Sequence, residues 1–208
     1  GVFSVRDLLD SVVEILEPRL RGKPLCITTE IDPGLPEMVK GDAGKIRQVL
    51  LNLASNAVKF TEHGQVTLGA SPCQQDKDGP WLRFSVTDSG AGISTQDQQR
   101  LFEEFWSGQQ PATMTGTGLG LTISRQLVEV LGGNISLDSQ PGAGSRFWFD
   151  IPVAATTPEE TAAELARRSE ARQRQATATQ TSFSGRILVA EDNPANQMIA
   201  QSMLSRLG

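Results

Sequence analysis

The chain of 208 residues is poor in several residue types on which particular classes of protein depend: it has two cysteines, one histidine and no tyrosine. Cys26 and Cys73 show neither metal-ligand nor redox spacing, which argues against a cysteine-based metal centre. We therefore expect two buried thiols in a reducing compartment. The single histidine, His63, lies in the turn TEHG, where we expect an exposed surface residue.

The chain also lacks long apolar runs and an excess of positive charge. No hydrophobic stretch reaches the about 18 residues that a membrane helix needs, and no signal sequence opens the chain. The net charge of −5 and a pI near 5.0 argue against a nucleic-acid partner, because a duplex selects basic surfaces. Since the chain begins at Gly1 without an initiator methionine, we expect it to be a piece of a longer protein.

Hydrophobic periodicity predicts helices and strands in alternation over residues 1–153. One helix is expected after Ser4, its N-cap, with an apolar face of Val5, Leu8, Leu9, Val12 and Leu16. A second runs from the N-cap Asp42 towards a stop at Gly64, with an apolar stripe of Ile46, Val49, Leu50, Leu53, Ala57 and Phe60. Strands are expected at 25–31, 65–71, 81–88, 134–139 and 145–153. This order predicts an α/β fold, a two-layer sandwich with helices on one face of the sheet.

The composition changes after Val153. Residues 154–185 are rich in Ala, Thr, Gln, Glu and Arg and nearly free of large apolar side chains, which predicts a polar linker with a helix at 158–175. Residues 186–208 begin with a hydrophobic strand that ends in the acidic pair Glu191 and Asp192, followed by a helical pattern.

Three alternate glycines, Gly116, Gly118 and Gly120, come directly before a helical stretch. Glycines let a ligand approach the backbone, and a helix N-terminus attracts anions, so a phosphate is the expected ligand. No lysine follows as in a Walker loop, and no buried strand precedes as in a dinucleotide fold. A flexible loop that closes on a helix remains the alternative. The polar residues before Gly116 suggest a lid.

The predicted helix at 42–60 carries a second, polar ridge. Asn52, Asn56 and Lys59 are spaced i, i+4 and i+7 and therefore share one side of the helix. A solvated face would explain them, but asparagine is an indifferent helix former. The functional alternative is that an amide oxygen binds Mg²⁺ while the lysine reaches a phosphate.

Strand 81–88 supplies a carboxylate on its core side. Leu82, Phe84 and Val86 share a face, and parity places Asp88 on that face at the end of the strand. A turn aspartate at a frayed strand end is one interpretation. The other is that Asp88 accepts a hydrogen bond from a ligand amine, such as the exocyclic amine of adenine.

Four motifs together resemble, in order and spacing, the N, G1, F and G2 boxes of sensor histidine kinases. They are Asn52-x-x-x-Asn56-x-x-Lys59-Phe60, Asp88-x-Gly90-x-Gly92, Phe102-x-x-Phe105 and Gly116-x-Gly118-x-Gly120. The resemblance covers residues 1–153. It implies the Bergerat fold of the GHKL superfamily, a mixed sheet with helices on one side, ATP between them, and a lid over the phosphates.

The resemblance also assigns roles to residues of this chain. Asn52 and Lys59 would be catalytic, with Lys59 contacting phosphate, and Asn56 would bind Mg²⁺. Phe60 would lie next to adenine, and Asp88 would recognise its amine. The remaining positions expected to bind ATP are Gly90, Gly92, Ile93, Phe102, Phe105, Thr115, Gly116, Thr117, Gly118, Leu119, Gly120 and Ser145.

One position distinguishes kinase from hydrolase in this superfamily. The hydrolytic members carry a glutamate where this chain has Asn52, and an amide cannot take a proton from an attacking water. The resemblance therefore implies a protein-histidine kinase that uses ATP and Mg²⁺. It would transfer phosphate to a histidine on an upstream dimerisation domain, in a homodimeric parent protein.

The C-terminal stretch resembles the start of a response-regulator receiver, in which Glu191 and Asp192 would be the incomplete Mg²⁺-binding acidic pair. The resemblance implies a hybrid sensor kinase that acts in a cytoplasmic phosphorelay with receiver and phosphotransfer domains. It also implies that the parent protein could be anchored in the inner membrane. The lid departs from the family because no basic residue lies between Phe102 and Gly116. The alternative function is a nucleotide-binding regulatory module that signals without kinase turnover.

Overall fold

The computed structural model describes residues 1–74, 79–102, 119–179 and Gln197. The chain divides into two compact units, Gly1–Pro158 and Glu159–Gly208. In the second unit the described part is essentially helix α5 (Pro158–Thr179), which lies within the predicted polar linker and includes the stretch expected to be helical. None of the helices in the described residues is long and apolar enough to cross a membrane.

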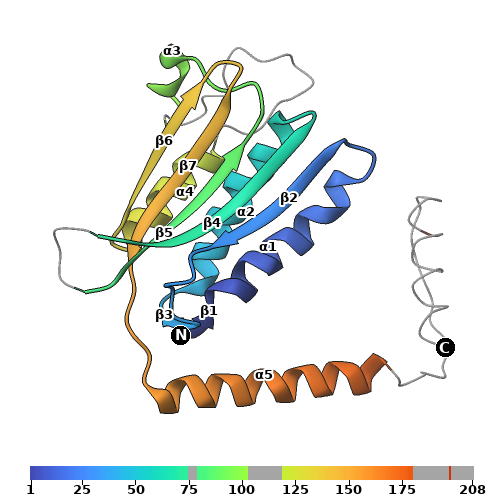
Figure 1. Ribbon diagram of the computed structural model, residues 1–208, viewed down its shortest axis with the longest axis vertical. Helices are drawn as coiled ribbons and strands as arrows, with labels where there is room; N and C mark the ends of the chain where they lie inside the picture. Colours follow the sequence, from blue (N-terminus) through green and yellow to red (C-terminus); the bar gives the residue numbers. More distant parts are fainter. Residues whose placement is uncertain (75–78, 103–118, 180–196, 198–208) are drawn as a thin grey trace. The chain divides into compact units, whose positions relative to one another are not determined.

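The first unit is built on a mixed five-stranded sheet with the order β2-β4-β5-β7-β6 (Figure 1). Its strands are β2 (Leu25–Ile31), β4 (Gly64–Cys73), β5 (Trp81–Asp88), β6 (Asn134–Gln140) and β7 (Gly144–Pro152). Strand β2 is parallel to β4, and the other neighbours are antiparallel. A separate antiparallel pair joins β1 (Val2–Ser4) to β3 (Met38–Lys40).

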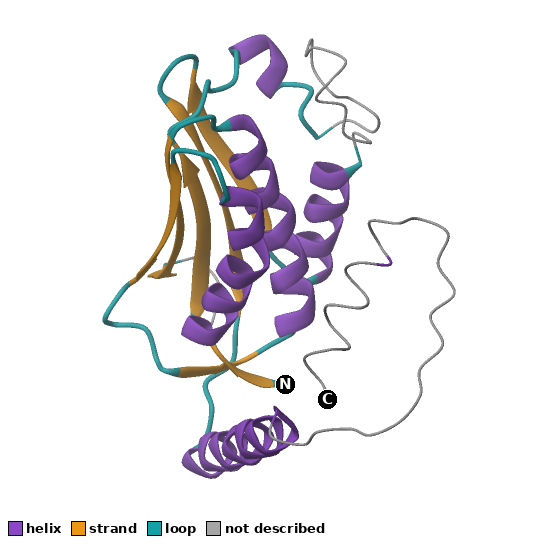
Figure 2. Cartoon of the chain, turned by 90° about the vertical axis from the view of Figure 1, so that its right-hand side faces the viewer, coloured by secondary structure: helices purple, strands orange, loops and turns teal. Residues whose placement is uncertain are grey.

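Three helices cover one face of this sheet, and a short fourth lies near its edge (Figure 2). The covering helices are α1 (Val5–Leu20), α2 (Ala43–Phe60) and α4 (Gly120–Val130), and the short one is α3 (Thr95–Gln98). Helix α2 lies between the other two, because it packs against both α1 and α4. The predicted two-layer α/β sandwich is thereby confirmed.

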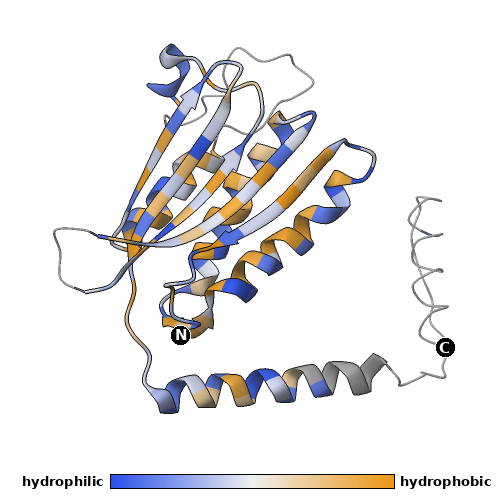
Figure 3. Ribbon diagram, in the orientation of Figure 1, coloured by the Kyte–Doolittle hydropathy of each residue, from blue (hydrophilic) through white to orange (hydrophobic). Residues whose placement is uncertain are grey.

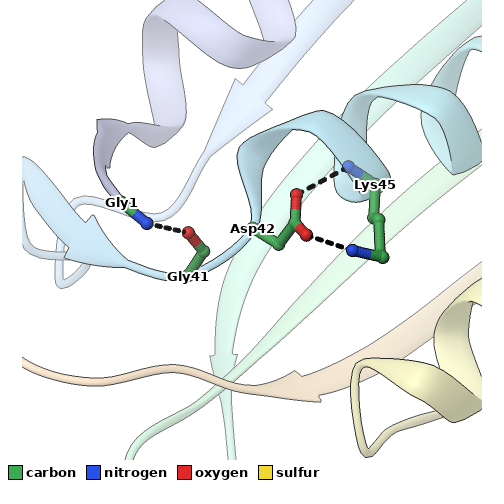
Figure 4. Close-up of polar contacts among 4 residues, drawn as sticks. All are labelled: Gly1, Gly41, Asp42 and Lys45. Atoms are coloured by element: carbon green, nitrogen blue, oxygen red, sulfur yellow. Dashed lines mark hydrogen bonds and ion pairs between the residues drawn. The ribbon is translucent and has the colours of Figure 1, made fainter.

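Helix caps form where the sequence placed them. Ser4 Oγ accepts a hydrogen bond from the backbone N–H of Asp7 at the start of α1. At α2 the Asp42 carboxylate accepts from the Lys45 backbone N–H at 3.1 Å and pairs with the Lys45 ammonium group (Figure 4). These hydrogen bonds, the side-chain bond first, lower the pKa of Asp42. The nitrogen of Gly1 donates to the Gly41 carbonyl at 2.7 Å and ties β1 to the loop before α2.

The core lies between the sheet and the helices. Hydrophobic and hydrophilic residues alternate along the strands, as Figure 3 shows, so each strand gives one side to the core. The rings of Phe84 and Phe149 stack with centroids 5.3 Å apart at its centre. The predicted apolar face of α1 is fully buried, as is the predicted stripe of α2 apart from Phe60.

The structure corrects the predicted end of the second helix. Helix α2 ends at Phe60, and Thr61 turns the chain into extended backbone, so Gly64 is not a helix stop. Gly64 instead opens β4 with a φ of 112°. Phe60, the last residue of the helix, is 37% exposed. The sequence also gave no indication of β1, β3 or α3.

The helix-free face of the sheet explains the two cysteines, which are not buried as predicted. Cys26 is exposed and Cys73 is partly buried, since both lie on the outward side of their strands. On the same face the Arg83 guanidinium bonds both carboxylate oxygens of buried Asp150, at 2.7 and 2.8 Å. This hydrogen-bonded pair joins β5 to β7 and raises the pKa of Arg83. His63 is exposed, as predicted.

Candidate functional site

The polar ridge predicted on α2 is present beside its buried stripe. Asn52, Asn56 and Lys59 are each partly buried, so the solvated-face interpretation does not describe them fully. The Lys59 ammonium nitrogen lies 4.8 Å from the ring centroid of Phe60, whose exposed ring closes the last turn of the helix. Two amides and one cation therefore line the side of α2 that leads to the end of β5.

At the other end of this ridge, α4 packs directly on Asn52. The Asn52 Nδ2 group donates a hydrogen bond to Ser124 Oγ at 2.8 Å. Gly120 permits the approach, because a Cβ on that residue would lie 2.4 Å from Asn52 Oδ1. In the described structure Gly120 is therefore required for packing against Asn52, in addition to any role near a phosphate.

Asp88 lies at the end of β5 on the face that the helices cover, as parity predicted. Its Oδ1 accepts the backbone N–H of Gly90 at 2.9 Å, and the backbone N–H of Ser145 on β7 also bonds the carboxylate. Burial nevertheless raises the pKa of Asp88 above its ordinary value, because desolvation outweighs these two donors. The site thus holds a partly desolvated carboxylate acceptor.

Gly90 lies where the end of α2 meets the end of β5. A Cβ on Gly90 would lie 2.7 Å from the Phe60 carbonyl oxygen and 2.9 Å from both Asp88 Oδ1 and Thr61 Oγ1. Three oxygen atoms therefore converge beside this glycine. Thr61 is fully buried, and its hydroxyl has no hydrogen-bond partner among the described residues. Sequence reasoning missed Thr61, since it follows the motif residues directly without a pattern of its own.

Gly92 anchors the loop after β5 on the turn between β6 and β7. Its φ of 68° lies in the left-handed region, and a Cβ there would lie 1.9 Å from the Gln140 carbonyl oxygen. The N–H of Gly142 donates to the Ala91 carbonyl at 2.7 Å. Gly144, with a φ of 90°, approaches Asp88 equally closely. These contacts fix the loop that carries the predicted G1 box.

A small polar cluster completes this anchor. Ser139 Oγ accepts the Ile93 backbone N–H at 2.8 Å and lies 2.9 Å from Ser145 Oγ. The Gln98 side-chain amide on α3 donates to the carbonyls of Ile93 and Ser139, both at 2.8 Å. The predicted site residues Ile93 and Ser145 are thus connected through Ser139. Neither Ser139 nor Gln98 belongs to a recognised motif, and the sequence did not indicate them.

Part of the predicted site lies outside the described residues. These positions are Phe105, Thr115, Gly116, Thr117, Gly118, Glu191 and Asp192. Phe102 and Leu119, which flank the gap, are both partly buried, and the guanidinium carbon of Arg125 lies 6.0 Å from the Phe102 ring centroid. Helix α4 begins at Gly120, and its N-cap Leu119 has no side-chain group that could accept from the first-turn N–H groups.

A metal ion would have few protein ligands here. Among the residues that the structure describes, no cluster of three or more His, Cys, Asp or Glu side chains could hold one. The Asn56 amide oxygen is a hard ligand of the kind that Mg²⁺ accepts. Because Mg²⁺ is commonly held by one or two protein groups together with substrate phosphates, the donor set fits a cation that arrives with a nucleotide.

Comparisons with known proteins agree with this geometry. Residues 41–155 match the family of histidine kinase-, DNA gyrase B-, and HSP90-like ATPases. The sensory/regulatory protein RpfC of Xanthomonas campestris pv. campestris is 38% identical over 224 residues, covering 99% of this chain and 31% of RpfC. The sensor histidine kinase AruS of Pseudomonas aeruginosa is 39% identical, covering 99% of this chain and 19% of AruS. The chain thus spans about a third or less of the length of these relatives.

Solved structures give the same result. Full-length ShkA in complex with AMPPNP superposes with a TM-score of 0.65 at 38% identity, over 76% of this chain and 32% of ShkA. The nucleotide-free catalytic domain of the histidine kinase ThkA superposes with a TM-score of 0.59 at 30% identity, over 73% of this chain and 94% of that domain. The resemblance drawn from the four motifs is confirmed. The chain belongs to the family of histidine kinase-, DNA gyrase B-, and HSP90-like ATPases, and it carries the ATP-binding domain of a sensor histidine kinase.

Proposed function

We propose that this chain binds Mg-ATP and donates the γ-phosphoryl group to a histidine on an upstream dimerisation domain of its parent protein. The observation that carries the proposal is the desolvated carboxylate of Asp88, held by the N–H groups of Gly90 and Ser145 beside the end of α2. A carboxylate in such surroundings is a strong acceptor for one amino group, and adenine offers an exocyclic amine.

The base end of the site is formed by residues from three elements. Asp88 ends β5, Ser145 lies opposite it on β7, and Phe60 exposes its ring at the end of α2. An aromatic face next to a single carboxylate acceptor suits a planar base with one amine. In this proposal Gly92 and Ile93 hold the loop after β5 in place, and strands β6 and β7 support that loop from the other side.

The phosphate end would be formed by α2 and the first turn of α4. Lys59 supplies a cation one turn from Asn56, and the first-turn N–H groups of α4 at Gly120 favour an anion. Asn56 would hold Mg²⁺ together with the phosphates. The bound ion would neutralise charge that develops on the transferred group.

Asn52 favours phosphoryl transfer over hydrolysis in this proposal. Its amide cannot accept a proton from water, so the site lacks a general base at that position. The expected acceptor is a histidine supplied by the upstream domain of a homodimeric, cytoplasmic kinase. Residues 186–208 would then begin a receiver, with Glu191 and Asp192 as its first metal ligands. Receiver and phosphotransfer partners would follow in the relay.

The decisive experiment follows radiolabel from γ-labelled ATP to the parent protein, alongside calorimetric titration of this chain with ADP. We expect ADP to reach its full affinity only when Mg²⁺ is present. Asn56→Ala should remove that Mg²⁺ dependence and should abolish labelling of the parent protein. The matched control is Asn134→Ala, since Asn134 is exposed on β6. Labelling that persists in Asn56→Ala would refute the proposed metal ligand.

The same experiment tests the second candidate, a nucleotide-binding regulatory module. The specific observation in its favour is the absence of lysine and arginine between Phe102 and Gly116. ADP binding with normal Mg²⁺ dependence, but without histidine labelling in the parent, would support the module and contradict the kinase.

A further inference from the structure

Asn52 is held by two residues of α4 that share one face of that helix. Gly120 and Ser124 are spaced i and i+4 and therefore lie one above the other. Gly120 leaves room for the carboxamide, since its missing Cβ would lie 2.4 Å from Asn52 Oδ1 and 3.1 Å from Nδ2. Ser124 accepts the hydrogen bond from Nδ2 at 2.8 Å.

The buried position of Ser124 makes this hydrogen bond specific. Ser124 is 1% exposed, so water does not compete freely for its hydroxyl, while the two helices α2 and α4 pack closely around it. Because Nδ2 is committed to Ser124, the oxygen of the same carboxamide is turned towards Gly120 and the first turn of α4.

We propose that Ser124 is a positioning residue that holds the Asn52 carboxamide against the first turn of α4, at the phosphate end of the site. The carboxamide is thereby held at the point where the proposed phosphoryl transfer occurs. The inference rests on the proposed function for its catalytic consequence, but the hydrogen bond between Asn52 and Ser124 can be measured without any activity. No motif residue identified from the sequence has this role.

The first test is spectroscopic and uses this chain. In ¹⁵N-labelled protein, the side-chain NH₂ protons of Asn52 should exchange with water about tenfold more slowly than those of exposed Asn134, because one proton is hydrogen-bonded. Ser124→Ala should remove that protection. The control Ser11→Ala removes a helix hydroxyl that donates to the Leu8 carbonyl in α1, and it should leave the Asn52 signals unchanged. Unchanged exchange at Asn52 in Ser124→Ala overturns the inference.

The second test is a double-mutant cycle in the parent protein. Ser124→Ala should slow single-turnover histidine phosphorylation about three- to tenfold, as expected for the loss of one hydrogen bond, with ADP affinity kept within about twofold. In an Asn52→Ala background the same change should have no further effect, since nothing remains to be positioned. An equal loss in both backgrounds would show a merely structural role and would contradict the inference. A wild-type parent that is not phosphorylated would refute the proposed function, while the exchange measurement would still decide whether Ser124 holds the Asn52 side chain.

Discussion

Replacing Asp88 by asparagine should weaken ADP binding and at the same time stabilise the free protein. In the structure Oδ1 is committed to the Gly90 N–H at 2.9 Å, so an asparagine would keep its oxygen there and place NH₂ at the other position. That NH₂ would face the amine of adenine, donor against donor. A hydrogen bond to a charged group contributes about 1.5–3 kcal/mol, so we expect Kd for ADP to rise about 10- to 100-fold.

The stability of the free protein should change in the opposite direction. Because burial raises the folded-state pKa of Asp88 above the ordinary 3.8, the carboxyl stabilises the fold fully only below that value. This contribution is lost as the pH rises through the folded-state pKa, whereas asparagine does not titrate. The melting temperature of Asp88→Asn should therefore exceed that of the wild type above pH 3.8, by a difference that grows with pH and then levels off.

Calorimetry with ADP and thermal denaturation from pH 3 to pH 8 measure both effects. The matched control is Asp138→Asn, since Asp138 is exposed on β6 and should change neither ADP affinity nor the pH profile. Unchanged ADP affinity in Asp88→Asn would remove this residue from the base pocket. If the difference in melting temperature between Asp88→Asn and the wild type stayed the same at every pH, the argument from desolvation would be refuted.

Two further predictions concern the scaffold. Gly92→Ala should lower the melting temperature far more than Gly142→Ala, although both glycines have positive φ, because only Gly92 lies against the Gln140 carbonyl. Thermal denaturation of both variants tests this, and equal losses would contradict the packing argument. Arg83→Ala should lower the free energy of unfolding by about 1.5–3 kcal/mol, since it removes both hydrogen bonds that the partly exposed guanidinium makes to buried Asp150. Urea denaturation measures this change in the free energy of unfolding. A decrease of less than about 1 kcal/mol would show that Arg83 and Asp150 behave as an exposed ion pair.

The sequence predicted those features that depend on a regular period. The apolar face of α1 follows the helical repeat, and alternation along β5 placed Asp88 on the core side. The same parity would have placed Cys26 and Cys73 on the outward face, where the structure has them, so this error was avoidable. The end of α2 was not predictable from Gly64, because the helix ends where Thr61 turns into extended backbone.

The site was predictable to the extent that its residues belong to spaced motifs. Asn52, Asn56 and Lys59 lie on one ridge because their spacing requires it. The contact of Asn52 with Ser124 joins residues 72 positions apart, and it depends on how closely α2 and α4 pack. Likewise, Thr61 becomes notable only because three oxygens converge beside Gly90. Such contacts arise from packing between elements, which no local pattern encodes.

The anchoring of the loop at residues 88–92 has a thermodynamic consequence. Ala91 and Gly92 rest on the β6–β7 turn, and Ile93 is bonded to Ser139, so the backbone is ordered before any ligand arrives. Ordering a loop during binding opposes association through lost conformational entropy, and here little of that entropy remains to be lost. Adenosine alone, without phosphates, should therefore bind with only a small entropic penalty from the ordering of this loop.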